Sequence, residues 1–495
     1  MKSTRRISLI LAAVLSALPF AACGTAEGGN LPEDSSTSDA PETTDEVKET
    51  SGVPAGTDLG GETISIWYTT KSVSVAETYV DLNPELTGDI LDDAIFNMNK
   101  AGETRLNCTL DFFNAQVETS ATGAEVQKMV LAGDDTYDMY HIVQWNGAQL
   151  AAEGYYANLG DAKYISYDKP WWDYKYMKEM TIGDDVIYCL SGDFAVDRTR
   201  CLNCVYYNKS MYENFYKDPN GLYQEVLDGN WTWEMMRKIS SEVYSDINND
   251  GITDREDRLG FCVNDYFHLD SFFYATGARA TERDKNDVPV ICLNSERTAD
   301  VIQGLYELVF NTEGVYFSGP LYEDDVKNRQ HFEDGNSMFL PGFFYTSEFM
   351  RDMKADYGIV PFPKYDEEQE QYYSDVHDII RLMVVPTTCN KIDDVCAVLE
   401  EMAFIGYTDV LAPYYNVLMK NKYARDDVSA EMLDIIRNNC SPDFAHMTDL
   451  NSIGYLQRKL IQAKSSDFAS TYASYYPEAQ KKLDDFVKVF NENKH

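Results

Sequence analysis

The alternation of short strands with amphipathic helices, which begins near Glu62, constrains the fold of this chain more than any other feature. Polar and apolar residues alternate over 63–67 and over 108–112, and residues 137–143 form a third strand-like run. Apolar residues at helical spacing follow each run: Leu91, Ala94, Ile95 and Met98, then Val126, Met129 and Val130, then a segment that starts near Trp145 and Asn146. Three successive β-α units predict a parallel sheet with helices on its faces, and such sheets bind ligands beyond the carboxyl ends of their strands.

Further short elements follow along the rest of the chain. Strands are predicted at 200–207, 259–263, 338–340 and 357–360, and residues 378–385 are apolar. Helices are predicted over 233–244, with Thr232 as the N-cap, and around 395–403 and 483–490. We find no internal repeat.

The size and charge of the chain exclude some functions. The 495 residues are 44% hydrophobic, and 82 Asp and Glu against 42 Lys and Arg give a net charge of −40. A chain this long is expected to form two or more domains or lobes. Its negative charge argues against binding of nucleic acid, which needs basic residues, and against adsorption to anionic lipid. A large enzyme, a ligand-binding protein or an interaction scaffold remains.

The first twenty-three residues have the pattern of an export signal. A basic start precedes an apolar run and two alanines before a cysteine: Lys2, Arg5 and Arg6, then residues 7–20, then Ala21, Ala22 and Cys23. This segment resembles a bacterial lipoprotein signal, in which cleavage before the cysteine leaves a thiol that carries diacylglycerol. Phe20 departs from that pattern, and ordinary secretion is the alternative. We expect a signal peptide at 1–22 and lipidation of Cys23.

Residues 24–57 have the composition of a linker. They contain no Phe, Trp or Tyr and consist mainly of Gly, Ser, Thr, Pro, Ala and acidic residues. Such a segment cannot bury enough apolar surface to fold. We therefore expect 23–57 to be a disordered acidic tether, and 58–495 to be the folded body.

The cysteines do not point to a metal or redox site. Ten cysteines less Cys23 leave nine, so at least one is unpaired within the chain. Cys201 and Cys204 form a C-x-x-C pattern, but in a strand positions three apart face opposite sides. Buried free thiols or an unrelated pairing are favoured over a redox or zinc site.

Residues 246–257 carry the sharpest chemical signal, the pattern of a twelve-residue calcium loop. Gly251 stands at position 6, where the chain bends around the ion. Oxygen ligands are predicted from the side chains of Asp246, Asn248, Asp250, Asp254 and Asp257 and from the carbonyl of Ile252. A strand is predicted directly after the loop instead of a second helix, so a structural Ca²⁺ is expected rather than a switch. The alternative is an Asn/Asp/Gly turn in an acidic protein.

No pattern of residues nominates a catalytic centre. The six histidines are scattered, and the chain has no P-loop, no G-x-G-x-x-G and no G-x-S-x-G. Paired carboxylates for glycoside hydrolysis stay open, because the acidic residues are numerous and their separation is a three-dimensional property.

Three segments of the body carry a family resemblance. Residues 132–138 read Ala-Gly-Asp-Asp-Thr-Tyr-Asp, residues 205–209 read Val-Tyr-Tyr-Asn-Lys, and residues 332–338 read Phe-Glu-Asp-Gly-Asn-Ser-Met. Together with the leader, the tether and the β-α order, they resemble the extracellular solute-binding proteins of ABC importers, particularly family 1, the sugar-binding type. Ser337 stands where that family usually has Ala. The calcium-type loop also matches an insertion found in many gut Firmicutes members.

The resemblance implies an α/β, type II periplasmic-binding-protein-like fold with two lobes, each a sheet flanked by helices, joined by a hinge. The first lobe would comprise 58–192 and 380–425, and the second 193–379 and 426–495. It further implies a monomer, lipid-anchored at the outer face of the cytoplasmic membrane of a Gram-positive bacterium. Such a protein closes over its solute, delivers it to ABC permease subunits and performs no chemistry.

The resemblance also implies a set of solute-binding residues at strand ends and at the crossing between lobes. They are Tyr68, Thr69, Thr70, Gln144, Trp145, Asp193, Asn264, Asp265, Tyr266, Phe343, Phe344 and Tyr345. Aromatic rings cover the apolar face of a sugar, and carboxylate and amide oxygens accept hydrogen bonds from its hydroxyls. Each aromatic residue is alternatively part of a lobe core, and Trp171 with Trp172 is expected to be a packing pair.

Capture of a sugar or oligosaccharide is the favoured function. The acidity and the 35 tyrosines suggest an oligopeptide or cationic-solute binder as the first alternative. A surface glycoside hydrolase is the second, and an adhesin or scaffold that shows no lobe closure is the third.

Overall fold

The computed structural model describes residues 49–71, 81–183, 186–264, 266–319, 322–418 and 427–493. The chain divides into two units, Met1–Glu49 and Thr50–His495, and all elements described below belong to the second. The predicted signal peptide, Cys23, most of the predicted tether and Asp265 lie outside the described residues. Over the described ranges, no helix combines the length and the apolar character needed to cross a bilayer.

Five strands form a first sheet in the order β2-β1-β3-β12-β4. They are β1 (Glu62–Tyr68), β2 (Cys108–Asn114), β3 (Met139–Val143), β4 (Cys189–Leu190) and β12 (Arg381–Val384). β1 runs parallel to β2 and β3, which confirms the predicted parallel arrangement for these three strands. β12 is antiparallel to β3 and β4, so the sheet as a whole is mixed. The β-α pattern at the start of the body did not reveal this, because β12 joins the sheet from far along the chain.

Another five strands form a second sheet in the order β11-β5-β10-β6-β9. They are β5 (Asn203–Asn208), β6 (Leu259–Val263), β9 (Val315–Phe317), β10 (Ser337–Phe343) and β11 (Tyr357–Val360). β10 is parallel to β6, whereas β5 is antiparallel to both β10 and β11. A separate hairpin pairs β7 (Thr281–Arg283) with β8 (Pro289–Ile291).

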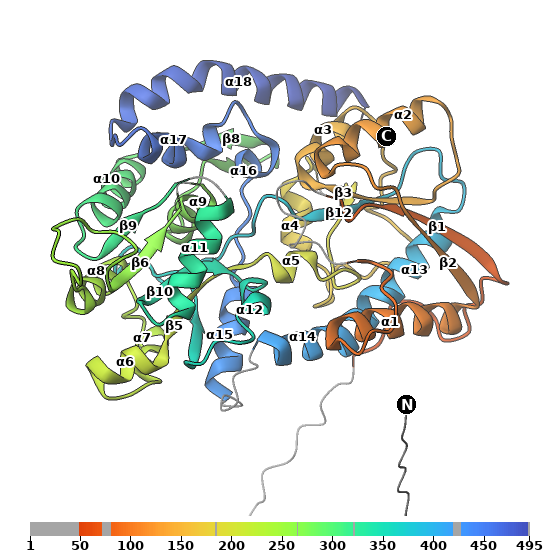
Figure 1. The fold of residues 1–495 in the computed structure, drawn as a ribbon. Coiled ribbons are helices and arrows are strands. Elements are labelled where there is room, and N and C mark those ends of the chain that lie inside the picture. Colours follow the sequence, from red (N-terminus) through yellow and green to blue (C-terminus); the bar gives the residue numbers. More distant parts are fainter. Residues whose placement is uncertain are drawn as a thin grey trace, which may run out of the picture. The chain divides into compact units, whose positions relative to one another are not determined.

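Helices surround each sheet (Figure 1). Those placed along the chain up to β5 are α1 (Ile90–Leu106), α2 (Thr122–Leu131), α3 (Gly147–Ala152), α4 (Tyr174–Glu179) and α5 (Asp197–Arg200). Those between β5 and β12 are α6 (Lys209–Tyr216), α7 (Gly221–Leu227), α8 (Trp233–Val243), α9 (Phe267–Ala275), α10 (Glu296–Phe310), α11 (Tyr322–Glu333) and α12 (Thr346–Phe349). Those after β12 are α13 (Ile392–Ile405), α14 (Leu411–Leu418), α15 (Asp427–Asn438), α16 (Phe444–Thr448), α17 (Leu456–Gln462) and α18 (Phe468–Asn493). Short helical turns are η3 (Gln144–Asn146) and η5 (Ile453–Tyr455), and the π-helical segment η4 (Gly406–Val410) continues α13.

Local sequence signals explain where several helices begin. Asp89 caps α1 by accepting from the backbone N–H of Leu91. Thr232 caps α8 by accepting from the backbone N–H of Met235, which confirms the N-cap predicted for this helix. The predicted strand at 200–207 is wrong at its start. Arg200 ends α5, and the strand begins only at Asn203. The α5 sequence Asp-Arg-Thr-Arg is polar, and the apolar residues of β5 come only after it.

The helix α18 contacts elements of the chain that follow β3 and elements that follow β6. It contacts β8 and α10 on one side and α3 on the other. Near its end, the side-chain amide of Asn493 donates to the carbonyl of Ala152, and the Phe490 ring lies 5.9 Å from that of Tyr188. Since this helix belongs to neither sheet, it does not show where one lobe ends and the other begins. The lobe boundaries therefore stay a prediction.

All nine described cysteines are free thiols, and all but Cys292 are buried. Cys201 follows α5 and Cys204 lies in β5, so the C-x-x-C pattern spans the end of a helix and a strand. Burial raises the pKa of the Cys440 thiol to about 11, which keeps it protonated. These thiols therefore behave as small core side chains.

Residues 50–57, which composition assigns to the tether, contact the folded body. Val53 is buried, and the backbone N–H of Gly52 donates to the carboxylate of Glu400 over 2.8 Å. The same carboxylate accepts from the indole N–H of Trp172 at 2.7 Å. Trp171 and Trp172 are both buried, so they pack inside the protein as expected.

Candidate functional site

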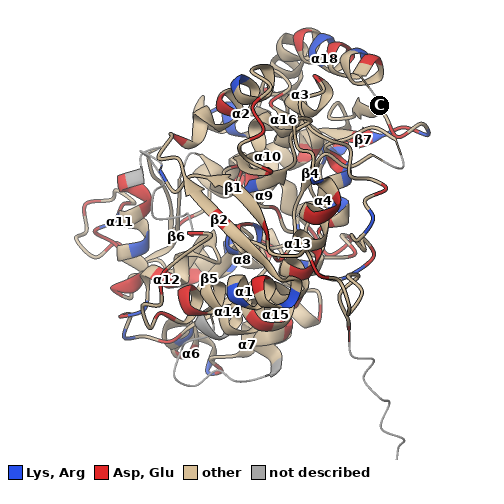
Figure 2. Cartoon of the chain, turned by 90° about the vertical axis from the view of Figure 1, so that its right-hand side faces the viewer, with Lys and Arg blue, Asp and Glu red and all other residues tan. Residues whose placement is uncertain are grey.

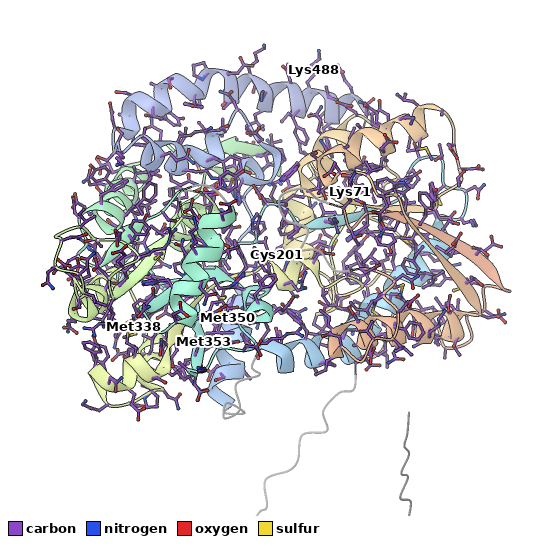
Figure 3. All side chains as sticks on the ribbon, viewed as in Figure 1. Lys71, Cys201, Met338, Met350, Met353 and Lys488 are labelled. Atoms are coloured by element: carbon purple, nitrogen blue, oxygen red, sulfur yellow. The ribbon has the colours of Figure 1, made fainter. Side chains whose placement is uncertain are left out.

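Two of the chain segments that cross between the sheets are hydrogen-bonded to each other. The first leads from α5 into β5 and the second leads toward β12. Leu202 pairs with Val376 in an antiparallel bridge, and His377 N–H donates to the carbonyl of Cys201 at 3.0 Å. Asn203 N–H donates to Asp375 carbonyl at 3.0 Å, and Asp375 N–H donates back to the Asn203 side chain. Figure 3 shows Cys201 in the middle of this unit, between the two sheets.

An aromatic cluster lies where strands of the second sheet end. β6 and β10 are parallel, so their carboxyl ends share one edge of the sheet. The ring centroid of His377 is 4.7 Å from that of Phe267 and 4.8 Å from that of Phe343. Tyr345 stacks on Phe343 at 5.5 Å with an interplanar angle of 13°. Beside this cluster Tyr266 remains 40% exposed, and it is thus available to a solute.

Polar side chains stand next to the aromatic cluster. The side-chain amide of Asn264 donates to Asp325 of α11 at 3.4 Å, while its oxygen accepts from the N–H of Tyr266 and of His268. Burial raises the pKa of Asp325 to about 6. Burial also lowers the pKa of His268 to about 3, so this imidazole is neutral at pH 7. The edge of the second sheet therefore presents a carboxyl group beside aromatic rings.

A network of charged side chains packs against the ring of Tyr266. The Arg458 guanidinium lies 3.7 Å from the Tyr266 ring centroid and 4.6 Å from that of Tyr455, and it pairs with Asp270. His446 lies 3.8 Å from the same Asp270 and 3.5 Å from Asp375 of the second crossing. This network therefore links the solute-facing edge to the crossing.

The second crossing carries a further pair, His377 and Asp378. The Nδ1 atom of His377 lies 2.9 Å from an Asp378 carboxylate oxygen. Burial opposes ionisation of Asp378, but the hydrogen bond and charge of His377, together with the charges of Arg458 and His446, lower the pKa of this carboxyl to about 2. Asp378 is therefore ionised at neutral pH.

On the first sheet, the loop after β1 is held by its own hydrogen bonds. Thr69 donates to the carbonyl of Val117, and Asn114 donates to the hydroxyl of Thr70. Lys71 forms an ion pair of 3.2 Å with Glu118, and Figure 3 shows it on the side of the first sheet that faces Cys201. The predicted residues of this loop thus have structural partners, and Thr70 and Lys71 are its more accessible members.

The predicted residues after β3 differ from each other. Gln144 is buried and accepts a hydrogen bond from the hydroxyl of Tyr176, so it is part of the interior. Trp145 is 38% exposed. It lies on η3, which contacts α16, and α16 contacts η5. Since η5 contains Tyr455, this chain of contacts connects Trp145 with the Arg458 and Tyr266 group.

Three other residues that are predicted to bind solute are buried. Asp193 is buried in an ion pair of 2.7 Å with Arg437 of α15. Burial raises the pKa of Asp193 to about 6, although Arg437 opposes the shift. Phe344 is fully buried, Tyr68 is 3% exposed, and the Tyr68 hydroxyl donates to Asp81.

The structure thus gathers Asn264, Tyr266, Phe343 and Tyr345 at one edge, and Trp145 at the neighbouring η3. Of these, Tyr266 and Trp145 are exposed, whereas Asn264, Phe343 and Tyr345 are buried. The structure adds residues that sequence reasoning did not select: Phe267, His268, Asp325, His377, Asp378 and Arg458. Phe267 and His268 directly follow Tyr266, so extending that segment by two residues would have found them. Asp325 and Arg458 lie on helices far along the chain, and no local pattern marks them.

In the predicted calcium loop, side-chain oxygens accept hydrogen bonds from loop backbone N–H groups. Asp246 accepts from Asn249 and Gly251. Three further side chains accept in the same way: Asn248 from the N–H of Asp250, Asp250 from that of Ile252, and Asp257 from that of Ile247. Asn249 and Gly251 have φ of 60° and 75°, which gives the loop its bend.

All the predicted ligand atoms of this loop are oxygens, and oxygens are the atoms that bind Ca²⁺ in proteins. The loop backbone also holds these side chains in place without an ion. Within the described ranges, no three acidic, histidine or cysteine side chains are grouped as a metal site. The ion therefore stays a proposal.

The chain resembles known proteins in its fold and not in its sequence. No protein-family model matches the sequence, and no curated protein is similar to it in sequence. The GacH receptor of Streptomyces glaucescens, solved unliganded and with acarbose, is similar with a TM-score of 0.53 and 12% identity, over 88% of this chain and 100% of that one. The cyclic α-maltosyl-1,6-maltose binding protein from Arthrobacter globiformis is similar with a TM-score of 0.53 and 13% identity, over 88% of this chain and 99% of that one. The chain has the fold of the two-lobed periplasmic binding proteins.

This fold confirms the predicted class, an α/β protein with two sheets flanked by helices. Similar binding proteins take different solutes. UgpB from Mycobacterium tuberculosis, solved in complex with glycerophosphocholine, is similar with a TM-score of 0.53 and 11% identity, over 87% of this chain and 99% of that one. The two-lobed binding-protein fold therefore does not name the solute, which has to be argued from the site.

Proposed function

We propose that this protein captures a sugar or oligosaccharide between its lobes and delivers it to the permease of an ABC importer. The observation that carries the proposal is the pair of accessible aromatic residues, Trp145 after β3 and Tyr266 after β6, one on each sheet. Aromatic faces cover the C–H face of a pyranose, and the carboxyl group of Asp325 supplies oxygens for its hydroxyls. The sugar-binding proteins with a similar fold support the same solute class.

A cationic solute is the second candidate, and a specific observation favours it. The ionised Asp378 and the carboxyl group of Asp325 lie close to the rings of Phe267, Phe343 and His377. Rings combined with carboxylates also suit a quaternary ammonium or amine group. The oligopeptide alternative shares this acidic character.

The proposal includes how the protein is held at the membrane. The lipoprotein-like leader supports cleavage before Cys23 and attachment of lipid to its thiol. The protein then stands at the outer face of the cytoplasmic membrane as a monomer, and the tether lets it reach the permease. Assignment to family 1 rests on the sequence segments at 132–138, 205–209 and 332–338. Binding without catalysis follows from the same assignment.

We further propose that the 246–257 loop holds a structural Ca²⁺. Support comes from the oxygen ligands at alternating positions and from the bend at Gly251. The ion would stabilise the connection between α8 and β6. It would not take part in solute binding.

A thermal-shift screen of the full chain against saccharides, peptides and polyamines tests the function. A ligand present at about a thousand times its Kd stabilises the folded state by roughly 4 kcal/mol, which such a scan detects. A selective shift with one saccharide class supports the proposal. A shift with polyamines, choline compounds or peptides alone replaces it by the second candidate, and turnover of a chromogenic glycoside would contradict a purely binding role.

A further inference from the structure

A cavity of about 360 Å³ lies apart from the candidate solute site. Its walls are α4, the segment around β7, residues 371–373 and residues 438–442. Figure 2 shows α4 and β7 toward the right-hand edge of the protein and α11, which carries Asp325, at the left-hand edge. The cavity and the aromatic cluster share no lining residue. They are therefore two distinct places in the fold.

The walls of this cavity belong to both sheet regions. α4 precedes β4 of the first sheet, whereas β7 follows β6 of the second. Residues 438–442 hydrogen-bond to the second crossing, since Ser374 N–H donates to Asn439 carbonyl at 3.1 Å and Ser441 N–H donates to Ser374 carbonyl at 3.0 Å. A molecule bound here contacts both regions beside the hinge.

The charge of the cavity is opposite to that of the chain. Four basic side chains and two carboxylates line it, namely Lys175, Lys178, Arg279, Arg283, Glu179 and Asp287. The whole chain carries a net charge of −40. The buried carboxylate of Asp443 also lies 3.8 Å from Arg279, so the local excess is a single positive charge, which favours an anion.

Most of these basic groups are fixed by neighbours, whereas one is not. Arg283 lies 3.6 Å from Glu179, and Lys178 lies 3.7 Å from Asp287. In the described part of the chain, Lys175 has no carboxylate within ion-pair distance. Its ammonium group thus supplies the uncompensated positive charge.

Neutral donors complete the cavity. The side-chain amides of Asn438 and Asn439 make no hydrogen bond to other described residues, and both line the cavity. Arg279 is held in place by donating to the carbonyl of Ser441 at 2.8 Å. The phenol ring of Tyr373 adds an apolar wall with a polar end.

We propose that this cavity is a second binding site, for a small organic anion that carries a phosphate or carboxylate group. Lysine, arginine and amide N–H groups are the donors that such groups prefer. Ligand pockets commonly measure about 300–1,000 Å³, so this cavity suits a small metabolite rather than an oligosaccharide. Lys175 and the two asparagines contact the anion.

Isothermal titration and thermal shift of the full chain test this site with inorganic phosphate, citrate and glycerol 3-phosphate, each against sodium chloride of equal ionic strength. We expect at least one of them to bind and to stabilise the protein beyond the chloride control. Lys175→Gln, a change of an exposed residue, should weaken that binding about ten-fold. Whether phosphate or citrate binds distinguishes the two anion classes.

Lys128→Gln is the matched control, because Lys128 is exposed on α2 and, among the described residues, forms its ion pair with Glu125 at 3.5 Å. This variant should bind the anion like the unaltered chain. The proposal is overturned if none of the three anions stabilises the protein more than chloride does. Equal affinities of the Lys175→Gln and Lys128→Gln variants would overturn it as well.

Discussion

The guanidinium group of Arg458 lies over the ring of Tyr266, 3.7 Å from its centroid, and the same group pairs with Asp270. One face of an accessible aromatic ring is therefore fixed by a residue of α17. A planar guanidinium can stack flat on a ring while its N–H groups bind a carboxylate, a geometry that a compact ammonium does not reproduce.

Replacing Arg458 by Lys should therefore release Tyr266 while keeping the charge. We expect solute affinity to fall about ten-fold, measured by isothermal titration. The control is Arg297→Lys, since Arg297 also lies over a ring, that of Tyr365 at 4.3 Å, and also pairs with a carboxylate, that of Asp366. Equal loss in both variants would show that the effect is not specific to the site.

Gly406 should tolerate no side chain, because it packs against the first crossing. A Cβ atom at this position would lie 1.8 Å from the carbonyl oxygen of Asp193. Gly406→Ala should lower the free energy of unfolding by about 3 kcal/mol, measured in urea. Gly56→Ala serves as its control, because nothing lies within 4 Å of a Cβ there. Unchanged stability of Gly406→Ala would refute the close contact.

The charge network at the second crossing should make stability depend on pH. Burial opposes protonation of His446, but Asp375 and Asp270 raise its pKa to about 9, above the usual 6.5. Its stabilising contribution is complete below about pH 6.5 and is lost as the pH rises through about 9. The free energy of unfolding should fall over this range by up to about 3 kcal/mol.

The variant His446→Gln isolates this effect. It should be less stable than the unaltered chain at pH 6, and its stability should change less between pH 6.5 and 10. Denaturant titrations at several pH values measure both. Parallel stability curves of the two proteins would contradict the assignment.

Removal of calcium tests the loop at 246–257. A chelator should lower the Tm of the full chain, and added Ca²⁺ should restore it. Asp250→Asn, at position 5, should abolish most of this dependence, whereas Glu256→Gln, at the non-ligand position 11, should keep it. A Tm that does not respond to chelator would leave the loop as an Asn/Asp/Gly turn.

The sequence predicted the elements better than the site. Strands such as 63–67 and helices such as that capped by Thr232 follow from local periodicity and capping, which neighbouring residues determine. Asp193 was expected to bind solute, yet its carboxylate pairs with Arg437, 244 residues away. Asp325 meets Asn264 across 61 residues. Such contacts are set by tertiary packing and leave no periodic signal in the sequence.

The central claim, capture of a carbohydrate between aromatic residues of the two sheets, is tested most directly by titration of the Trp145→Ala and Tyr266→Ala double variant. The saccharide that stabilises the unaltered chain is the titrant, and Tyr476→Ala, at another exposed tyrosine, is the control. We predict that the double variant loses at least about a hundred-fold in affinity and that the control keeps it. Unchanged affinity of the double variant would contradict the account.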